Sequence, residues 1–210
     1  GSFTNTIDPL TVTGSTSTPT STSFQYTVNT IAGTPVVWTG GGGIDTLWSN
    51  PSNWNSGVPG LNDLVIVEAA STELDFTTPT LSGVQLDGDF EINASGNLNV
   101  SGNLLNYSHM NLSGNGTISG SGTWHNLNYT SILGDNTNLS IANINNHEFI
   151  RWAQLLPTAS TLTVSGSGAF DNWGTFHVFA LAPTSNTLNF TGPVGLLNHG
   201  FFDIFTGPDL

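Results

Sequence analysis

The chain has 210 residues, of which 37% are hydrophobic, and 12 Phe and 6 Trp provide enough apolar surface for a packed domain. Arg151 is the single basic residue against 14 acidic ones, so the net charge is −13. This charge argues against binding to nucleic acids or anionic membrane surfaces, which requires clusters of Lys and Arg. The sequence contains no stretch of about 20 apolar residues, so no membrane-spanning helix is predicted. The absence of cysteine excludes disulfides and thiolate zinc sites. The remaining composition, rich in Asn, Ser, Thr and Gly, favours a secreted or bacterial cell-surface protein.

Residues 1–35 differ in character from the rest of the chain. Thr11–Thr13 and Phe24–Val28 predict two strands around a Ser-, Thr- and Pro-rich linker, Gly14–Ser23. The region can be interpreted as a strand pair, a linker or a cap, and its sequence leaves these alternatives open. Gly1-Ser2 is typical of a cloning remnant, so we expect the chain to be a fragment of a longer protein.

Residues 36–80 form a Trp-rich entry segment that includes a first rung, and residues 81–210 are predicted to be solenoid rungs. Strand Leu64–Val67 is expected to begin the coil. An upstream rung is predicted at Leu86–Ile92. In this rung Leu86 occupies the position that an asparagine occupies in the later rungs. At the other end, Phe205–Leu210 stops partway through a unit, and we expect the solenoid to be truncated there.

An internal repeat runs through the second half of the chain, aligned on asparagines at 20-residue intervals up to Asn146 and at 26-residue intervals after it. These ladder asparagines are Asn106, Asn126, Asn146, Asn172 and Asn198. Two residues before them, every unit has an apolar residue: Leu104, Trp124, Ile144, Phe170 and Leu196. Four and six residues after them, the side chains are again apolar except for Thr130. Five residues after them, the side chains are polar: Asn111, Ser131, Arg151, His177 and Asp203.

This alternation of apolar and polar positions indicates strands with one face inward. Because the same columns recur in every unit, each unit is predicted to stack on the previous one at about 4.8 Å per rung. The predicted fold is all-β, a parallel β-helix (β-solenoid) with 20- and 26-residue rungs and an N-terminal β cap or hairpin. The change to the longer rung predicts that one side of the coil widens after Asn146.

The asparagine column is interpreted as structural. Stacked amides can pass hydrogen bonds from rung to rung at a bend between two strands. Asparagine also tolerates the left-handed backbone conformation that a bend often demands.

The entry segment contains a Trp- and Gly-rich motif: Trp38-Thr39-Gly40-Gly41, Leu47-Trp48-Ser49-Asn50-Pro51, Asn53-Trp54, Gly57-Val58-Pro59-Gly60 and Asp63. With the Ser-Gly and Asn-x-Gly repeats that follow, it resembles the segment that opens the β-solenoid repeat region of large bacterial autotransporter-like and filamentous-haemagglutinin-like surface adhesins. The resemblance extends over roughly residues 36–205. It implies that Trp48 and Trp54 cover the first rung, and that the function is adhesion, cohesion or passenger display.

Two classes of function follow. In the first, the chain is a non-catalytic structural or adhesive segment whose partners are neighbouring rungs, glycans or other surface proteins. In the alternative, an outward face binds a repetitive ligand, a carbohydrate or ice; the Thr-x-Thr row that ice requires fails, because Thr161-Leu162-Thr163 aligns with Thr187-Leu188-Asn189. Aromatic side chains stack on sugar rings. The candidate ligand-contact residues are Tyr107 and Trp173, each next to a ladder asparagine, and Arg151, His177 and Asp203.

A polysaccharide-active enzyme is the least favoured alternative. β-Elimination needs a base and a cation at the uronate, and only Arg151 is available. His199-Gly200 lacks the flanking residues of pectinase-like hydrolases. Asp87 and Asp89 are predicted on one face of a strand at a spacing suited to glycoside hydrolysis, but outward acidic pairs are common on acidic proteins. We predict no catalysis.

No metal or other cofactor is expected. His147 and His199 are predicted two rungs apart, about 10 Å, which is too far to share one zinc ion. Calcium stays an open hypothesis because Asp-rich turns supply oxygen ligands, although the calcium-binding nonapeptide is absent; an unchanged melting temperature in EDTA would exclude it. Glycosylation is a further hypothesis. The Asn-x-Ser/Thr sites are Asn93, Asn99, Asn106, Asn111, Asn115, Asn128, Asn138 and Asn189.

Overall fold

A computed structural model describes residues 35–68, 71–134, 136–154, 160–180, 187–191 and 195–206, all of them within one compact unit that spans residues 33–210. The prediction for residues 1–35 lies, apart from Pro35, outside these described residues. Strands dominate the described part, and its one helical element is a short 3-10 turn, η1 (Pro51–Asn53). None of its helices is long and apolar enough to cross a membrane.

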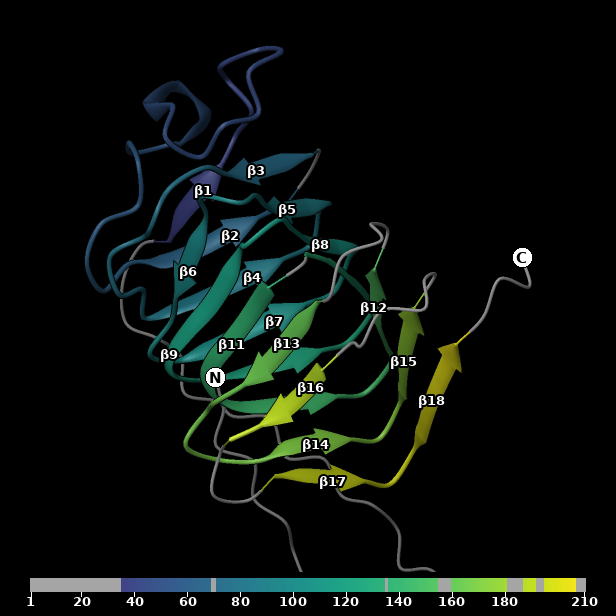
Figure 1. Cartoon of the computed structure of the whole chain (residues 1–210). Helices are drawn as coiled ribbons and strands as arrows, with labels where there is room; N and C mark the ends of the chain where they lie inside the picture. Colours follow the sequence, from purple (N-terminus) through teal and green to yellow (C-terminus); the bar gives the residue numbers. More distant parts are fainter. Residues whose placement is uncertain are drawn as a thin grey trace, which may run out of the picture. The chain divides into compact units, whose positions relative to one another are not determined.

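The described strands form three columns, which we call walls 1, 2 and 3, and the chain passes through them in that order in each rung (Figure 1). Wall 1 contains β6 (Asn97–Asn99), the first halves of β9 (Thr117–Asn126) and β11 (Asn136–Asn146), β13 (Thr161–Val164) and β16 (Thr187–Phe190). Wall 2 contains β1 (Val36–Trp38), β2 (Leu64–Val67), β4 (Gly83–Leu86), β7 (Asn103–Asn106), the second halves of β9 and β11, β14 (Phe170–Asn172) and β17 (Leu196–Asn198). Wall 3 contains β3 (Thr72–Leu74), β5 (Phe90–Ile92), β8 (Met110–Ser113), β10 (Tyr129–Leu133), β12 (Phe149–Gln154), β15 (Thr175–Ala180) and β18 (Phe201–Thr206).

All pairings between these strands are parallel, and the predicted parallel β-helix is confirmed. The ladder asparagines are register partners: Asn106 pairs with Asn126, and Asn126 with Asn146. Asn146 pairs with Asn172, and Asn172 with Asn198. The predicted 20- and 26-residue steps are therefore the true rung lengths.

The coil begins earlier than predicted. Leu86 pairs with Asn106 and so occupies the ladder position of the upstream rung, as expected. Strand β2, however, is not the first strand of wall 2, because β1 pairs with it in parallel through Val36 and Val65. The long interval between these two strands hides their relation in the sequence.

The extra residues of the longer rungs lie mostly between walls 3 and 1. Ile132 pairs with Trp152, a step of 20, whereas Asn136 pairs with Thr161, a step of 25. The step reaches 26 where Ile144 pairs with Phe170. Most of the additional residues are thus inserted between Trp152 and Thr161.

The interior is filled by the apolar columns that the alternation predicts. Leu104, Trp124, Ile144 and Phe170 follow one another down wall 2, and each is at most 3% exposed. Burying a large apolar side chain contributes about 1.5–3 kcal/mol relative to leaving it in water, so this stack stabilises the fold together with the other buried columns. One predicted outward residue, Ser131, is instead buried at 6% exposure, because the Tyr129 side chain lies over it with its hydroxyl 3.2 Å from Ser131 Oγ.

The part of the Trp-rich segment that lies between β1 and β2 covers the N-terminal edges of two walls. In wall 3, the Trp48 amide donates to the Glu73 carbonyl (2.8 Å), and the Glu73 amide donates to the Thr46 carbonyl (2.8 Å). In wall 2, the Asn55 amide donates to the Val37 carbonyl (3.0 Å). These bonds occupy backbone groups that an edge strand would otherwise expose.

The tryptophans hold this segment onto the first rung. Trp48 is fully buried, and its ring packs on Trp54 (centroids 4.6 Å apart) and on Phe90 of β5 (5.5 Å). The Trp54 indole N–H donates to the Trp48 carbonyl (2.8 Å). The side-chain amide of Asn53, also fully buried, donates to the carbonyls of Asp45 and Leu47.

Candidate functional site

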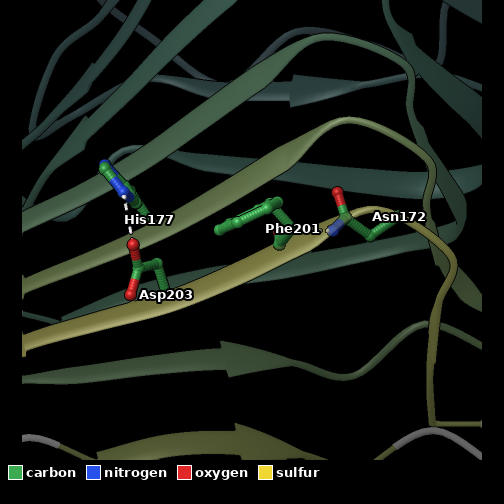
Figure 2. A network of polar contacts seen from close by, with 4 residues as sticks. All are labelled: Asn172, His177, Phe201 and Asp203. Atoms are coloured by element: carbon green, nitrogen blue, oxygen red, sulfur yellow. Dashed lines mark hydrogen bonds and ion pairs between the residues drawn. The ribbon is translucent and has the colours of Figure 1, made fainter.

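The ladder asparagines form a continuous hydrogen-bonded column at the bend between walls 2 and 3. Nδ2 of Asn126 donates to Oδ1 of Asn146 (2.8 Å), and Oδ1 of Asn126 accepts from Nδ2 of Asn106 (2.9 Å). Nδ2 also donates to the carbonyl of Phe149 in the next rung (3.1 Å). The same bond recurs between Asn172 and the Phe201 carbonyl (2.9 Å; Figure 2). The side-chain amides of the ladder therefore form hydrogen bonds between neighbouring rungs.

The ladder asparagines do not adopt a left-handed backbone conformation. Among the described residues other than glycine, only Asn62 has a positive φ, of 64°. Asparagine is used at the bend for its amide group, which can accept from one rung and donate to the next. The ladder also includes Thr130, the one polar residue in its column, whose buried hydroxyl donates to Asn126 Oδ1 (2.8 Å).

The residues that directly follow the ladder asparagines project outward, and we call them the bend column. Its members are Tyr107, Leu127, His147, Trp173 and His199. Tyr107 is 47% exposed and Trp173 58% exposed, so both predicted aromatic contacts lie on the surface. One face of the Trp173 ring stacks on the His199 ring, with centroids 4.2 Å apart and planes at 18°.

The two histidines of the bend column have different partners. His147 stacks on His125 of wall 2 (6.2 Å, 6°), and not on Trp173. Burial lowers the pKa of His125 below its ordinary value of 6.5, and the charge of His147 lowers it further. His199 Nε2 lies 3.6 Å from Oδ1 of Asp171, so each histidine has its own partner.

The predicted outward row of wall 3 is present. Arg151 is the register partner of His177, and His177 that of Asp203. His177 Nε2 lies 3.3 Å from Asp203 Oδ2 (Figure 2). Arg151 does not join this pair: its guanidinium carbon lies 5.2 Å from the ring centroid of Phe179.

A second outward row of wall 3 is aromatic, three residues after the ladder. Tyr129 and Phe149 stack face to face (5.3 Å, 8°), His109 meets Tyr129 edge-on (4.9 Å), and His177 meets Phe149 edge-on (5.2 Å). The ring faces are therefore covered by one another, and only their rims face solvent. Sequence reasoning missed this row, although the same alignment on asparagine would have identified it.

The candidate carboxylate pair is not on a strand. Asp87 and Asp89 flank Gly88 in the exposed turn between β4 and β5. Within the described ranges, no three His, Asp or Glu side chains are grouped closely enough to hold a metal ion. The cavity bordered by Ile141, Val164 and Phe190 has a volume of about 10 Å³, room for one water molecule at most.

The glycosylation sites differ in accessibility. Asn106 is fully buried in the ladder. Four others are exposed: Asn115, Asn128, Asn138 and Asn189. Only exposed asparagines can be reached by a modifying enzyme, so modification stays a prediction for these positions.

Comparison with known proteins gave no match: no protein-family model, no curated protein and no solved structure is significantly similar to the chain.

Proposed function

We propose that the chain is a non-catalytic structural and adhesive β-solenoid segment of an exported bacterial surface protein. The observation that carries the proposal is that its rungs repeat without interruption, so that length grows by a fixed step with each rung. Such a stack acts as a spacer or as a long regular surface. Its composition and its resemblance to the repeat regions of surface adhesins favour the same role.

The two ends of the described solenoid differ in how far their edge groups are covered. The N-terminal edges are closed by the Trp-rich segment. At the C-terminal end, Ile204 is 57% exposed although it continues an inward column in which Val178 is only 6% exposed. Asn198 accepts from Asn172 but is itself exposed, and its Nδ2 turns to the carbonyl of Gly200 (3.1 Å). The last described rung therefore exposes apolar and amide groups that the inner rungs bury.

Adhesion can be tested by displaying the chain on a bacterium that does not adhere. We expect several-fold more attachment to host-cell and glycan-coated surfaces, or more cell–cell aggregation, than with an unrelated β-helix displayed in the same way. Equal attachment of the two strains to all surfaces, with cleavage of any member of a polysaccharide panel by the purified chain, would overturn the proposal in favour of an enzyme.

Carbohydrate binding is the second candidate, and the exposed stack of Trp173 on His199 favours it. A large, half-exposed indole held by a neighbouring ring is a preformed platform for the apolar face of a sugar. On a glycan array, we expect a defined set of hits that Trp173→Ala removes and Trp173→Phe retains. The absence of any hit would leave the scaffold role alone.

A further inference from the structure

Among the described residues, the single Arg of this acidic chain has no polar partner. Arg151 donates no hydrogen bond and forms no ion pair within the described part of the chain, although 14 acidic residues are present in the sequence. The carboxylate in its own row, Asp203, is paired with His177. The five N–H donors on the guanidinium are therefore not used by the described residues.

The described neighbours of Arg151 in its own and the preceding rung are uncharged. On its own strand, the residues on the same face as Arg151 are Phe149 and Ala153. Ala153 is fully buried, because neighbouring side chains cover it on this face. Its neighbour in the preceding rung is Ser131, buried beneath Tyr129. In the following rung, the guanidinium lies against the Phe179 ring. These apolar surfaces keep water away from part of the cation, which strengthens its interaction with an anion.

A planar guanidinium that stacks on an aromatic ring presents its edge as a two-pronged donor, and this edge fits a carboxylate. Only one carboxylate can be matched, because the chain has no other Lys or Arg and a net charge of −13 that repels polyanions. The apolar rims of Tyr129 and Phe149 and the hydroxyl of Tyr129 suit the C–H groups and hydroxyls of a sugar ring.

We propose that Arg151 is the anchor of a binding site for the carboxylate of an acidic sugar that occurs singly on a glycan, such as a terminal uronic acid. The inference rests on the carbohydrate-binding candidate above and assigns to it a site on wall 3, separate from Trp173. Phe179 is a positioning residue that holds the guanidinium in place.

The test compares methyl glucuronide with methyl glucoside, which has the same ring without the charge, by saturation-transfer NMR and titration of the full chain. We expect the acid to bind and the neutral sugar to bind at least roughly tenfold more weakly. Arg151→Gln should weaken binding of the acid roughly 10- to 100-fold, the loss expected for a charge-assisted pair. Arg151→Lys, which retains the charge but lacks the fork, should fall between the two. Leu61→Ala, at an exposed apolar position outside walls 1 to 3, is the control and should change nothing.

Three results would overturn the inference: equal binding of the acid and the neutral sugar, no effect of Arg151→Gln in a variant with an unchanged melting temperature, or acetate binding as well as the sugar acid. These outcomes are distinct from failure of the parent candidate. If glycans bind and only Trp173→Ala removes them, carbohydrate binding stands and the Arg151 site alone fails. If no glycan binds at all, both fail, and the adhesion test still judges the scaffold role.

Discussion

Asn126 shows at the scale of one residue what the ladder position requires. Its side chain accepts from Asn106 and Thr130 and donates to Asn146, Asn128 and Phe149, all within a bend that excludes water. No other neutral side chain of this size offers two acceptor sites and two donors.

The ladder predicts a sharp difference between an interior and a terminal asparagine. Asn126→Ala removes the donor to the buried Asn146 Oδ1 and the acceptor of the buried Thr130 hydroxyl, so the free energy of unfolding should fall by about 2–5 kcal/mol. Asn198→Ala, at an exposed position, should cost less than about 1 kcal/mol. Urea unfolding followed by circular dichroism checks both, and equal losses would contradict a ladder that works by burial.

His125 predicts how stability changes with pH. Because burial, and then the charge of His147, lower the pKa of His125 in the folded state, the unfolded state takes up the proton more readily. This contribution to stability is complete above the unfolded pKa of about 6.5 and is lost as the pH falls below it. We expect the urea midpoint to drop between about pH 7 and pH 5, with a smaller drop in His125→Gln. His147→Gln removes only the lesser cause and should reduce the drop less; an identical pH profile in all three proteins would count against this account.

At the scale of an element, strand β9 passes from wall 1 to wall 2 without interruption, and Gly120 lies at this corner. This residue has φ of +120°, and a Cβ there would collide with the Val100 carbonyl of the preceding rung. The strand can thus turn a corner and remain paired with β6 and β7. The rung is closed at this corner by close backbone approach, and at the ladder corner by side-chain amides.

Two glycines with positive φ, Gly43 and Gly120, allow the cost of backbone strain to be measured separately from the cost of a steric clash. Gly43 has φ of +75° and no atom within 4 Å of a Cβ, so Gly43→Ala should cost only about 1–2 kcal/mol of backbone strain. Gly120→Ala adds the collision with Val100 and should cost at least about 2 kcal/mol more. Thermal unfolding of the two variants provides the comparison, and similar melting temperatures would show that the rungs can move apart at this corner.

At the scale of the whole molecule, the rung is the unit that can be added or removed. Deletion of residues 107–126 removes β8 and β9 together and joins Asn106 to Leu127, so that Asn106 takes the place of Asn126. We expect a folded protein with the same β spectrum and a lower free energy of unfolding. Deletion of residues 117–126 removes half a rung and should abolish folding, because β10 of wall 3 then follows β8 of wall 3 directly, with no wall 1 or wall 2 strand between them. Circular dichroism and size-exclusion chromatography measure both, and failure of both deletions to fold would show that the rungs are not interchangeable.

Much of this fold can be predicted because the rung repeats. One alignment on asparagine places Leu104, Trp124 and Ile144 in the same inward column, and the structure buries all three. The start of the coil could not be predicted in the same way. Strand β1 is separated from β2 by residues 39–63, and no repeat relates the two.

The outward surface is less predictable than the core. The alignment places Arg151, His177 and Asp203 in one row, but only the folded chain pairs the last two and turns Arg151 toward Phe179. Likewise Ser131 has a polar outward position, yet the ring of Tyr129 buries it. A long side chain at the surface has several rotamers of similar energy, each with a different neighbour. Its position in the sequence does not determine which rotamer it adopts.

The sequence by itself determined the parallel β-helix, its 20- and 26-residue rungs, its inward columns and its asparagine ladder. These follow from periodicity, because every rung must place apolar groups inside and amides at the bend. Only the tertiary structure decided that the Trp-rich segment caps two walls, that the ladder bend needs no left-handed residue, and that Trp173 stacks on His199 while Arg151 lies against Phe179. Those features depend on contacts between side chains of different rungs. The geometry of these contacts is set by how the folded rungs stack, and the sequence pattern alone does not give it.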